Sequence, residues 1–429
     1  MKVLMFGWEF PPHIAGGLGT ACYGLTKGLY KQGVEVLFVM PSATGDEDQS
    51  AVKILNASDV PIMQSWTGVK DFFSKVSFIK VSSDLVPYID PNVWGEVVSD
   101  SLRKKEYEEF RIKYGSKYKF SGRYGTSLME EVSRYAMVAA TIASNNDFDI
   151  IHAHDWLTYA AGIAAKRVSG KPLVIHVHAT EFDRSGENIN SEVYNIEKMG
   201  MEHADRVITV SNLTRNIVIN KYGIDPAKVF TLHNAVDFNE FKQMDVRRGV
   251  KEKIVTFLGR ITFQKGPEYF IEAANKVLAK SPDVRFVMAG NGDLLNRSIR
   301  RVAKLGIADR FHFTGFLKGD EVKRMFAYSD VYVMPSVSEP FGISPLEAMK
   351  SNVPTIISKQ SGVAEVLKYA IKIDFWDIDA MADAIYALLS YPALSQMTVR
   401  CGMDEVNSLK WENAAKILNK VYKEVTKRN

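Results

Sequence analysis

The chain has 429 residues, of which 46% are hydrophobic and 24% are charged. This length is enough for two ordinary domains, and the composition excludes a disordered or fibrous protein. The 54 basic and 50 acidic residues give a net charge of +4, a balance that does not indicate a nucleic-acid-binding protein.

The sequence has no apolar run of about 18 residues, the length that predicts a membrane-spanning helix. Residues 2–7 are apolar but meet Trp8 and Glu9 at once, which is typical of a buried strand and too short for a signal peptide. Cys22 and Cys401 lie far apart and lack the spacing of a metal site. We therefore expect a cytoplasmic protein with reduced cysteines.

Short apolar runs alternate with helical segments along the chain. In the first half, strands are expected at 3–6, 34–40, 150–151, 173–177 and 207–210, with amphipathic helices at 20–31 and 128–143. In the second half, strands are expected at 254–258, 284–288, 331–334 and 355–357, with a helix from Pro267 to about residue 280. Continuous apolar strands between helices predict parallel sheets that are covered on both faces.

The two halves together predict an α/β protein with two doubly wound domains. We place the first domain at 1–245, the second at 246–395 and C-terminal helices at 396–429. Loops at the carboxyl ends of the two sheets would then face each other across a cleft, where ligands bind. Closure of this cleft would need a hinge near 238–251.

Residues 103–124 do not follow the alternation of apolar strands and helices. They hold eight Lys or Arg, three Glu and six aromatic residues, which gives this stretch a local charge of +5. One interpretation is a solvated helix and loop whose aromatic rings pack on the first domain. The other is an acceptor-binding surface, with aromatic faces for sugars and positive charge for an anion.

A glycine-rich segment, Gly16-Gly17-Leu18-Gly19, leads into the first helix. Glycines there let backbone N–H groups approach an anion at the helix N-terminus. A dinucleotide fingerprint fails because Cys22 stands where Gly or Ala is needed, and a P-loop fails at residues 24–26. A plain glycine-rich turn is the structural alternative.

Two cations, Arg260 and Lys265, flank the loop after the expected strand 254–258. Fixed cations at a strand end can hold a diphosphate. Taken alone, they are better explained as ordinary surface charges. Pro267 suits the first turn of the following helix.

Glu339 and Glu347 bracket a loop that follows the strand 331–334. Ser344 can cap a helix with Pro345 in its first turn, and Glu347 would then complete a capping box. Glu339 lies before this cap and has no such structural role. The helix N-terminus behind residues 341–343 would present N–H groups and a positive dipole to a phosphate.

The histidines form two pairs, His152 with His154 and His176 with His178. We expect the two side chains of each pair to point to opposite faces of a strand, which argues against a shared metal. His154 and His178 would lie at the functional edge of the sheet, and His152 and His176 would face the core.

These motifs resemble those of the retaining, nucleotide-sugar-dependent glycosyltransferases of family 4, the glycosyl transferases group 1, which have the GT-B fold. The resemblance is to the glycogen and starch synthase side of the family and runs over essentially the whole chain. It rests on the pair Arg260 and Lys265, on the glutamate spacing around Phe341-Gly342, and on His154-Asp155-Trp156. The family pattern also implies that the terminal helix crosses back to brace the first domain.

The resemblance implies a role for each matching residue. Arg260 and Lys265 would neutralise the diphosphate leaving group, and Glu339 would contact hydroxyls of the donor sugar. His178 would steady the sugar beneath its reacting face, and His154 with Asp155 would line the acceptor side. The remaining donor contacts would be Gly16 and Gly17 at the phosphate, the amides of Phe341, Gly342 and Ile343, Glu347 at the ribose, Ser361 and Gly362 at the phosphates, and Leu317 beside the base.

The implied reaction is transfer of glucose, with retention, from a nucleotide-diphosphate sugar to a glycan, most plausibly an α-glucan. UDP-glucose and ADP-glucose are the favoured donors, and neither a metal nor another cofactor is expected. Ile14 replaces a lysine of the bacterial and plant glycogen and starch synthases, which weakens the expectation of ADP-glucose in particular. A lipid-linked or cell-envelope acceptor at a membrane surface is the less favoured alternative, and a non-catalytic nucleotide- or glycan-binding module is a third.

Overall fold

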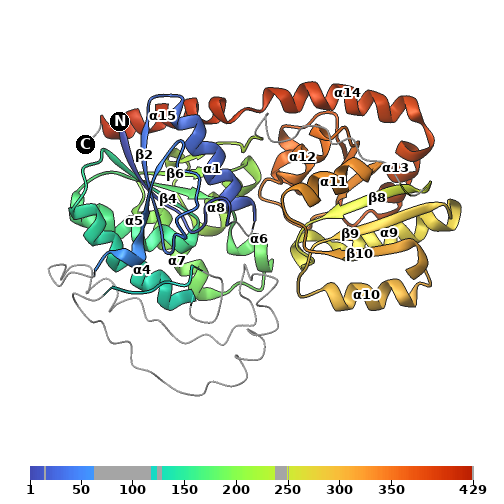
Figure 1. Cartoon of the computed structure of the whole chain (residues 1–429), viewed down its shortest axis with the longest axis horizontal. Helices are drawn as coiled ribbons and strands as arrows, with labels where there is room; N and C mark the ends of the chain where they lie inside the picture. The colour runs from blue at the N-terminus through green and yellow to red at the C-terminus, as the bar shows by residue number, and fades with distance from the viewer. Residues whose placement is uncertain (14–15, 62–116, 123–127, 237–248, 250, 428–429) are drawn as a thin grey trace, which may run out of the picture.

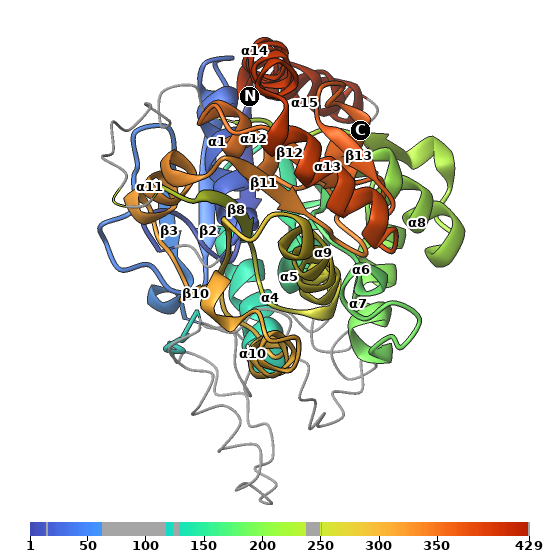
Figure 2. The same cartoon turned by 90° about the vertical axis from the view of Figure 1, so that its right-hand side faces the viewer.

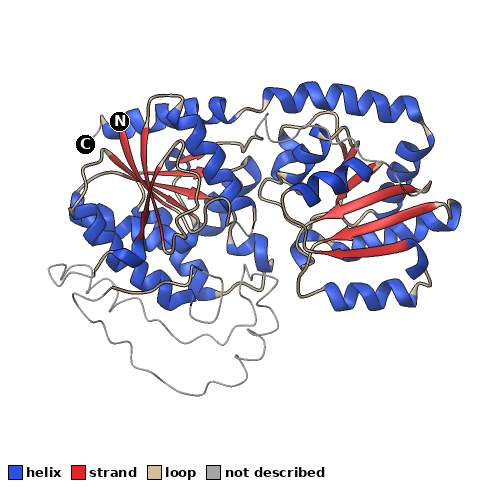
Figure 3. Ribbon diagram, in the orientation of Figure 1, coloured by secondary structure: helices blue, strands red, loops and turns tan. Residues whose placement is uncertain are grey.

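The computed structural model describes residues 1–13, 16–61, 117–122, 128–236, 249 and 251–427. Within these residues the chain forms two α/β domains, each built on a parallel sheet with helices around it (Figures 1 and 3). The predicted fold class is therefore confirmed. None of the described helices is long and apolar enough to cross a bilayer.

The first domain holds a seven-stranded parallel sheet in the order β3-β2-β1-β4-β5-β6-β7. Its strands are β1 (Lys2–Phe6), β2 (Glu35–Met40), β3 (Lys53–Asn56), β4 (Ile150–His154), β5 (Leu173–Val177), β6 (Arg206–Thr209) and β7 (Val229–Thr231). The order reverses between β1 and β4, so the loops after these two strands diverge and leave room for a ligand. The sequence patterns missed β3 and β7, because these edge strands are only partly buried and lack a continuous apolar run.

Helices cover this sheet: α1 (Gly17–Tyr30), α4 (Leu128–Ser144), α5 (Trp156–Ser169), α6 (Glu181–Ser185), α7 (Ser191–His203) and α8 (Asn212–Tyr222), with 3-10 turns at Ala57–Asp59 and Pro226–Lys228. The buried face of α4 lies against α5. The expected amphipathic helices at 20–31 and 128–143 are thus present as α1 and α4.

The second domain holds a six-stranded parallel sheet in the order β10-β9-β8-β11-β12-β13. Its strands are β8 (Lys253–Leu258), β9 (Val284–Ala289), β10 (Phe311–Gly315), β11 (Val331–Met334), β12 (Thr355–Ser358) and β13 (Ile371–Ile373). Its helices are α9 (Pro267–Lys280), α10 (Leu295–Lys304), α11 (Asp320–Tyr328), α12 (Ser344–Lys350), α13 (Ile378–Ser390) and α14 (Pro392–Ser408), with 3-10 turns η3 (Phe263–Lys265), Ala308–Arg310 and η5 (Gly362–Glu365). The strand order reverses between β8 and β11, directly beside the loops that carry the predicted site.

The last two helices connect the domains along one side of the molecule (Figures 1 and 2). Helix α14 packs on α12 and α13, whereas α15 (Trp411–Thr426) packs on α1 of the first domain. A Cβ at Gly24 would lie 2.2 Å from the Trp411 ring, and one at Gly28 would lie 2.6 Å from the Trp411 carbonyl oxygen. Glycine therefore allows the two helices to approach closely.

The carboxyl ends of the two sheets face each other at the domain junction. A Cβ at Gly17, after β1, would lie 3.8 Å from Ile343 Cδ1, after β11. Ser338 Oγ donates to Asp183 Oδ1 at 2.6 Å between the domains. Residues 237–248 and 250, where we expect the hinge, and most of the basic aromatic stretch 103–124 lie outside the described residues.

Candidate active site

The loop after β8 brings the first two predicted site residues to the junction. Arg260 is half-buried and its Nη2 donates to Gln264 Oε1 at 3.2 Å, while Lys265 ends the turn η3. Gly266 follows with φ +65°, and a Cβ there would lie 2.2 Å from the carbonyl oxygen of Pro335. Only glycine fits this contact, which seats the loop against the chain segment after β11.

Lys265 Nζ forms an ion pair with Glu339 Oε2, and the two side chains are 20% and 9% exposed. Ser336 Oγ lies 3.4 Å from the same carboxylate oxygen. Gly342 has φ +97°, and a Cβ there would lie 3.1 Å from Met334 Sδ and 3.2 Å from Glu339 Cγ. The structure thus joins the first cation motif to the glutamate motif through one partly buried ion pair.

Helix α12 begins differently from the sequence prediction. Its N-cap is Ile343, which makes no side-chain cap, and Ser344 Oγ shares a hydrogen bond of 2.8 Å with the Tyr332 hydroxyl. The predicted capping box of Ser344 and Glu347 is therefore wrong, because Ser344 is the first helical residue and its hydroxyl faces β11. Pro345 in the first turn is confirmed. Glu347 is half-buried on α12.

Ser361 and Gly362 lie behind the Glu339 loop rather than facing an open space. Ser361 Oγ donates to the Ser358 carbonyl oxygen at 2.6 Å, and the Gly362 N–H donates to the Glu339 carbonyl oxygen at 2.8 Å. Because an amide has one hydrogen to donate, the phosphate contact expected from Gly362 is not present in this arrangement. Leu317 is half-buried after β10 and packs on the apolar cluster that contains Met334.

The glycine-rich segment of the first domain faces the loop that holds Glu339 and Ile343 in the second domain. Gly16 is extended, no side chain caps α1 at this residue, and a Cβ there would meet no atom within 4 Å. The Gly19 N–H donates to the buried carboxylate of Glu9 at 3.0 Å. A helix N-terminus with open space before it favours an anion such as phosphate.

The four histidines share one face of the first sheet, so the expectation that each pair splits between two faces is wrong. The ring centroids of His152 and His154 are 4.1 Å apart, and those of His176 and His178 are 4.3 Å apart. The physical reason is that side chains alternate with a period of two, so residues i and i+2 point the same way.

His178 is the half-buried member at the junction, and its Nε2 lies 2.9 Å from His154 Nδ1. Burial lowers the pKa of His178 to about 3, so its imidazole is neutral at physiological pH. A neutral ring can donate or accept a hydrogen bond but carries no fixed charge.

Asp155 caps α5 through a 2.8 Å bond from the Trp156 N–H and has φ +63°, an unusual value for a residue with a Cβ. It is fully buried, and burial raises its pKa, while the positive charges of Arg184 and Arg260 oppose that shift.

The sequence analysis did not predict three contacts at the domain junction. Glu9 holds the glycine-rich segment, and the bond from Ser338 to Asp183 joins the domains. Phe263, in η3, is 55% exposed and would lie 4.0 Å from a Cβ at Gly186 in the first domain. Of the residues in these contacts, only Asp183 has a recognisable local sequence pattern. Thr180 and Asp183 have the spacing of a capping box, and they form that box at the start of α6.

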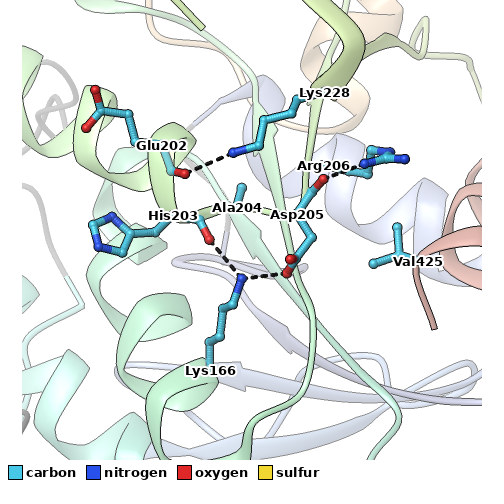
Figure 4. A pocket seen from close by; sticks show the side chains of 8 residues that line it. All are labelled: Lys166, Glu202, His203, Ala204, Asp205, Arg206, Lys228 and Val425. Atoms are coloured by element: carbon cyan, nitrogen blue, oxygen red, sulfur yellow. Dashed lines mark hydrogen bonds and ion pairs between the residues drawn. The ribbon is translucent and has the colours of Figure 1, made fainter. Parts of the chain in front are cut away.

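A separate pocket lies at the opposite, amino edge of the first sheet (Figure 4). Lys166 Nζ there donates to the His203 carbonyl oxygen at 3.0 Å and to Asp205 Oδ2 at 2.7 Å, and Lys228 Nζ donates to the Glu202 carbonyl oxygen at 3.0 Å. None of the predicted site residues lines this pocket.

Comparisons with known proteins agree with this description. Residues 2–227 match the family model described as the starch synthase catalytic domain, and residues 239–402 match the model described as glycosyl transferases group 1. An uncharacterized glycosyltransferase of Methanocaldococcus jannaschii is 27% identical, with 99% of this chain and 98% of that protein covered. A glycogen synthase of Mycobacterium tuberculosis is 25% identical, with 98% and 94% covered.

Two solved structures show the same fold over nearly the full lengths of both chains. Sucrose-phosphate synthase from Thermosynechococcus elongatus has a TM-score of 0.72 at 17% identity and covers 100% of each chain. The Anabaena protein HepE, solved in complex with UDP-glucose, has a TM-score of 0.67 at 15% identity, with 99% of this chain and 100% of that chain covered.

Two parallel α/β domains with cations and helix N-termini at their junction define the class as a GT-B glycosyltransferase that uses a nucleotide sugar. Its relatives include glycogen synthase. The chain belongs to the family of the starch synthase catalytic domain.

Proposed function

We propose that the protein is a retaining glucosyltransferase that moves glucose from a nucleotide-diphosphate glucose to an α-glucan. Family membership and the glycogen synthase relative support the acceptor class. The UDP-glucose complex of the structurally similar HepE supports the donor class. UDP-glucose is our first choice, and ADP-glucose is the second.

One observation carries this proposal: Lys265 and Glu339 pair beside Arg260, and across the junction the glycine-rich start of α1 faces residue 343. A donor placed here would have two cations and a helix N-terminus near its diphosphate. Glu339 would then hydrogen-bond hydroxyls of the sugar, as its carboxylate accepts hydrogen bonds only.

The chemistry needs these groups when the bond between the sugar and the diphosphate breaks. Positive charge then develops on the anomeric carbon and negative charge on the departing diphosphate. Cations and amide dipoles that are already in place stabilise this negative charge without reorganising. We propose that Arg260 and Lys265 fill this role and that the transfer step uses no metal.

On the acceptor side, we propose that neutral His178 contacts the sugar beneath its reacting face and that His154 and Asp155 line the acceptor position. In a front-face reaction a leaving-group phosphate oxygen takes the proton of the acceptor hydroxyl as the new bond forms. Retention of configuration then needs no carboxylate base, in keeping with the pairing of Glu339 to Lys265.

A lipid-linked or cell-envelope acceptor is the second candidate. The local charge of +5 in 103–124 favours it, because a basic stretch suits an anionic surface. Of the six aromatic residues in this stretch, Phe120 is buried in the core of the first domain and Tyr118 packs against that core. The two candidates differ in where the acceptor resides, so a direct assay separates them.

The test is an assay of the purified full chain with UDP-, ADP- and GDP-glucose, each paired with a maltooligosaccharide or with a lipid extract. Release of nucleoside diphosphate with the maltooligosaccharide, and product cleavable by an α-glucosidase, is the expected result. Release only with lipid would move the proposal to the second candidate. Tight donor binding without transfer to any acceptor would overturn both and favour a non-catalytic module.

A further inference from the structure

Three histidines of the first domain gather on one face of two neighbouring strands. His152 and His154 lie on β4, His176 lies on β5, and the strand register places His154 directly beside His176. A ligand nitrogen from each of the three lies within 4.8 Å of the other two. His152 and His154 are completely buried and His176 is 2% exposed, so the group lies in the interior of the first domain.

The nitrogens at the centre of this group have no hydrogen-bond partner in the described part of the chain. They are His152 Nε2, His154 Nε2, and both Nδ1 and Nε2 of His176. A buried polar atom without a partner costs free energy, and several in one place indicate a missing ligand. This is the observation that separates the group from an ordinary buried histidine.

The outer nitrogens of two of the rings do have partners. His152 Nδ1 lies 2.5 Å from the Tyr422 hydroxyl of α15, and His154 Nδ1 lies 2.9 Å from His178 Nε2. When each Nδ1–H donates to its partner, each Nε2 carries a lone pair that no group in the described part of the chain engages. Metal-binding histidines have this arrangement, in which a second contact sets the tautomer and ring orientation.

The charges around the group suit a cation. All three imidazoles are buried, and a neutral imidazole keeps one nitrogen lone pair that can bind a metal. A carboxylate follows directly in the chain, since Asp155 is the residue after His154. Asp155 Oδ2 is itself buried without a hydrogen-bond partner.

We propose that His152, His154 and His176 form a binding site for a divalent transition metal of the zinc class. Three imidazoles with one open position are an established zinc donor set, and imidazole suits this class of metals. The ring planes lie within 32° of one another, and the Nδ1 contacts of His152 and His154 fix the orientation of two of the rings.

The proposed site shares no residue with the donor contacts, but it uses the buried His154 that the proposed function places on the acceptor side. Its test therefore measures bound metal and unfolding rather than glucosyl transfer. An ion there ties β4 to β5 and, through Tyr422, to α15. It also fixes the proton of His154 on Nδ1, which makes His178 Nε2 an acceptor and leaves the His178 proton on Nδ1. The metal is thus a structural group that sets the tautomer of a residue at the junction.

The test uses the full chain after removal of metals by a chelator, with Zn²⁺ and Co²⁺ as the probes. We expect one ion per chain, a rise in the unfolding midpoint with Zn²⁺, and the visible absorption of a four-coordinate site with Co²⁺. His176→Gln and His152→Gln should each abolish stoichiometric binding. Tyr422→Phe should weaken it about tenfold, as loss of an outer contact does.

The matched control is His312→Gln, since His312 is exposed on β10 of the other domain and should bind as the wild type does. Folding of every variant is checked by circular dichroism without metal. No bound ion in the folded wild type, or unchanged binding in His176→Gln, would overturn the proposal. So would a thiolate-to-cobalt absorption band that Cys22→Ser removes, because the ion would then occupy the trio of Cys22, His154 and His178 instead.

Discussion

At the scale of single residues, Lys265 and Glu339 balance each other's charge in a partly buried place. The sequence indicated both residues but not their contact, since 74 positions separate them. A donor diphosphate entering beside them would draw Lys265 toward its negative oxygens. The pair therefore keeps the cation in place before the donor binds.

We predict that Lys265→Ala lowers the turnover number by about 100-fold or more, the usual effect of removing one group that stabilises a leaving anion. The measurement is steady-state release of nucleoside diphosphate. Lys276→Ala is the matched control, because Lys276 is an exposed lysine of the same domain that pairs with Asp379. Equal losses in both variants would contradict a role for Lys265 in the reaction.

A second residue-scale prediction concerns Gly342. Replacement by alanine forces a Cβ into a φ of +97° beside Glu339, so we expect a loss of about 1–3 kcal/mol in unfolding free energy and at least a tenfold fall in kcat/KM. Gly306→Ala also has positive φ, but nothing lies within 4 Å of its Cβ. The Gly306→Ala variant should therefore lose stability but keep its activity. If the two variants have the same activity, the position of Glu339 does not depend on Gly342.

At the scale of elements, the short helix α6 is held by buried charges beneath the junction. Arg184 bridges Glu181 and Glu197, and the Tyr222 hydroxyl of α8 also donates to Glu197. No local pattern in the sequence predicts this network, because its members come from three helices. The strands, by contrast, could be predicted from apolar runs in the sequence wherever both faces of the strand are buried.

We predict that Glu197 makes stability depend on pH. Burial raises its pKa from 4.5 to about 7, although Arg184 opposes the shift. The folded carboxyl therefore binds its proton more tightly than the unfolded one, and its favourable contribution is lost as pH rises from about 4.5 through 7. At about 1.4 kcal/mol per pKa unit and about 2.5 units, the loss is at most about 3–4 kcal/mol.

Urea unfolding of wild type and Glu197→Gln at pH 5 and pH 8 measures this contribution. The wild type should lose stability relative to the variant as pH rises. Parallel pH dependences would show that Glu197 is ionised in the folded protein throughout this range.

At the scale of the whole molecule, the two domains meet through polar contacts between loops and through Val210 and Val236 of the first domain, which belong to an apolar cluster with residues of the second. The Glu365 carboxylate of η5 accepts hydrogen bonds from the Asn212 and Leu213 N–H groups at 2.9 and 2.8 Å, and pairs with His233 at 2.8 Å. It thus lies at the positive end of α8, where an anion is stabilised. These contacts hold the two sheet edges together around the proposed donor position.

We predict that Glu365→Gln opens the junction. Small-angle scattering should show a larger radius of gyration than in the wild type, and saturating UDP should reduce the difference if UDP binds between the domains. Glu272→Gln is the control, since Glu272 pairs with Arg301 inside the second domain. An unchanged radius in Glu365→Gln would mean that other contacts hold the closed arrangement.

The sequence by itself determined the α/β class, the strands that are buried on both faces, and the residue types of the site. Continuous apolar runs indicate strands that are buried on both faces. Arg260, Lys265 and Glu339 follow two such runs, which places them in loops after strands. Only the tertiary structure decided which of these residues touch, because the strand order and the packing of two domains bring distant positions together. It also reversed two local expectations, the capping box at Ser344 and the opposed histidines. In the described part of the chain it shows a cluster of imidazoles with nitrogens that lack a hydrogen-bond partner, which no spacing argument had predicted.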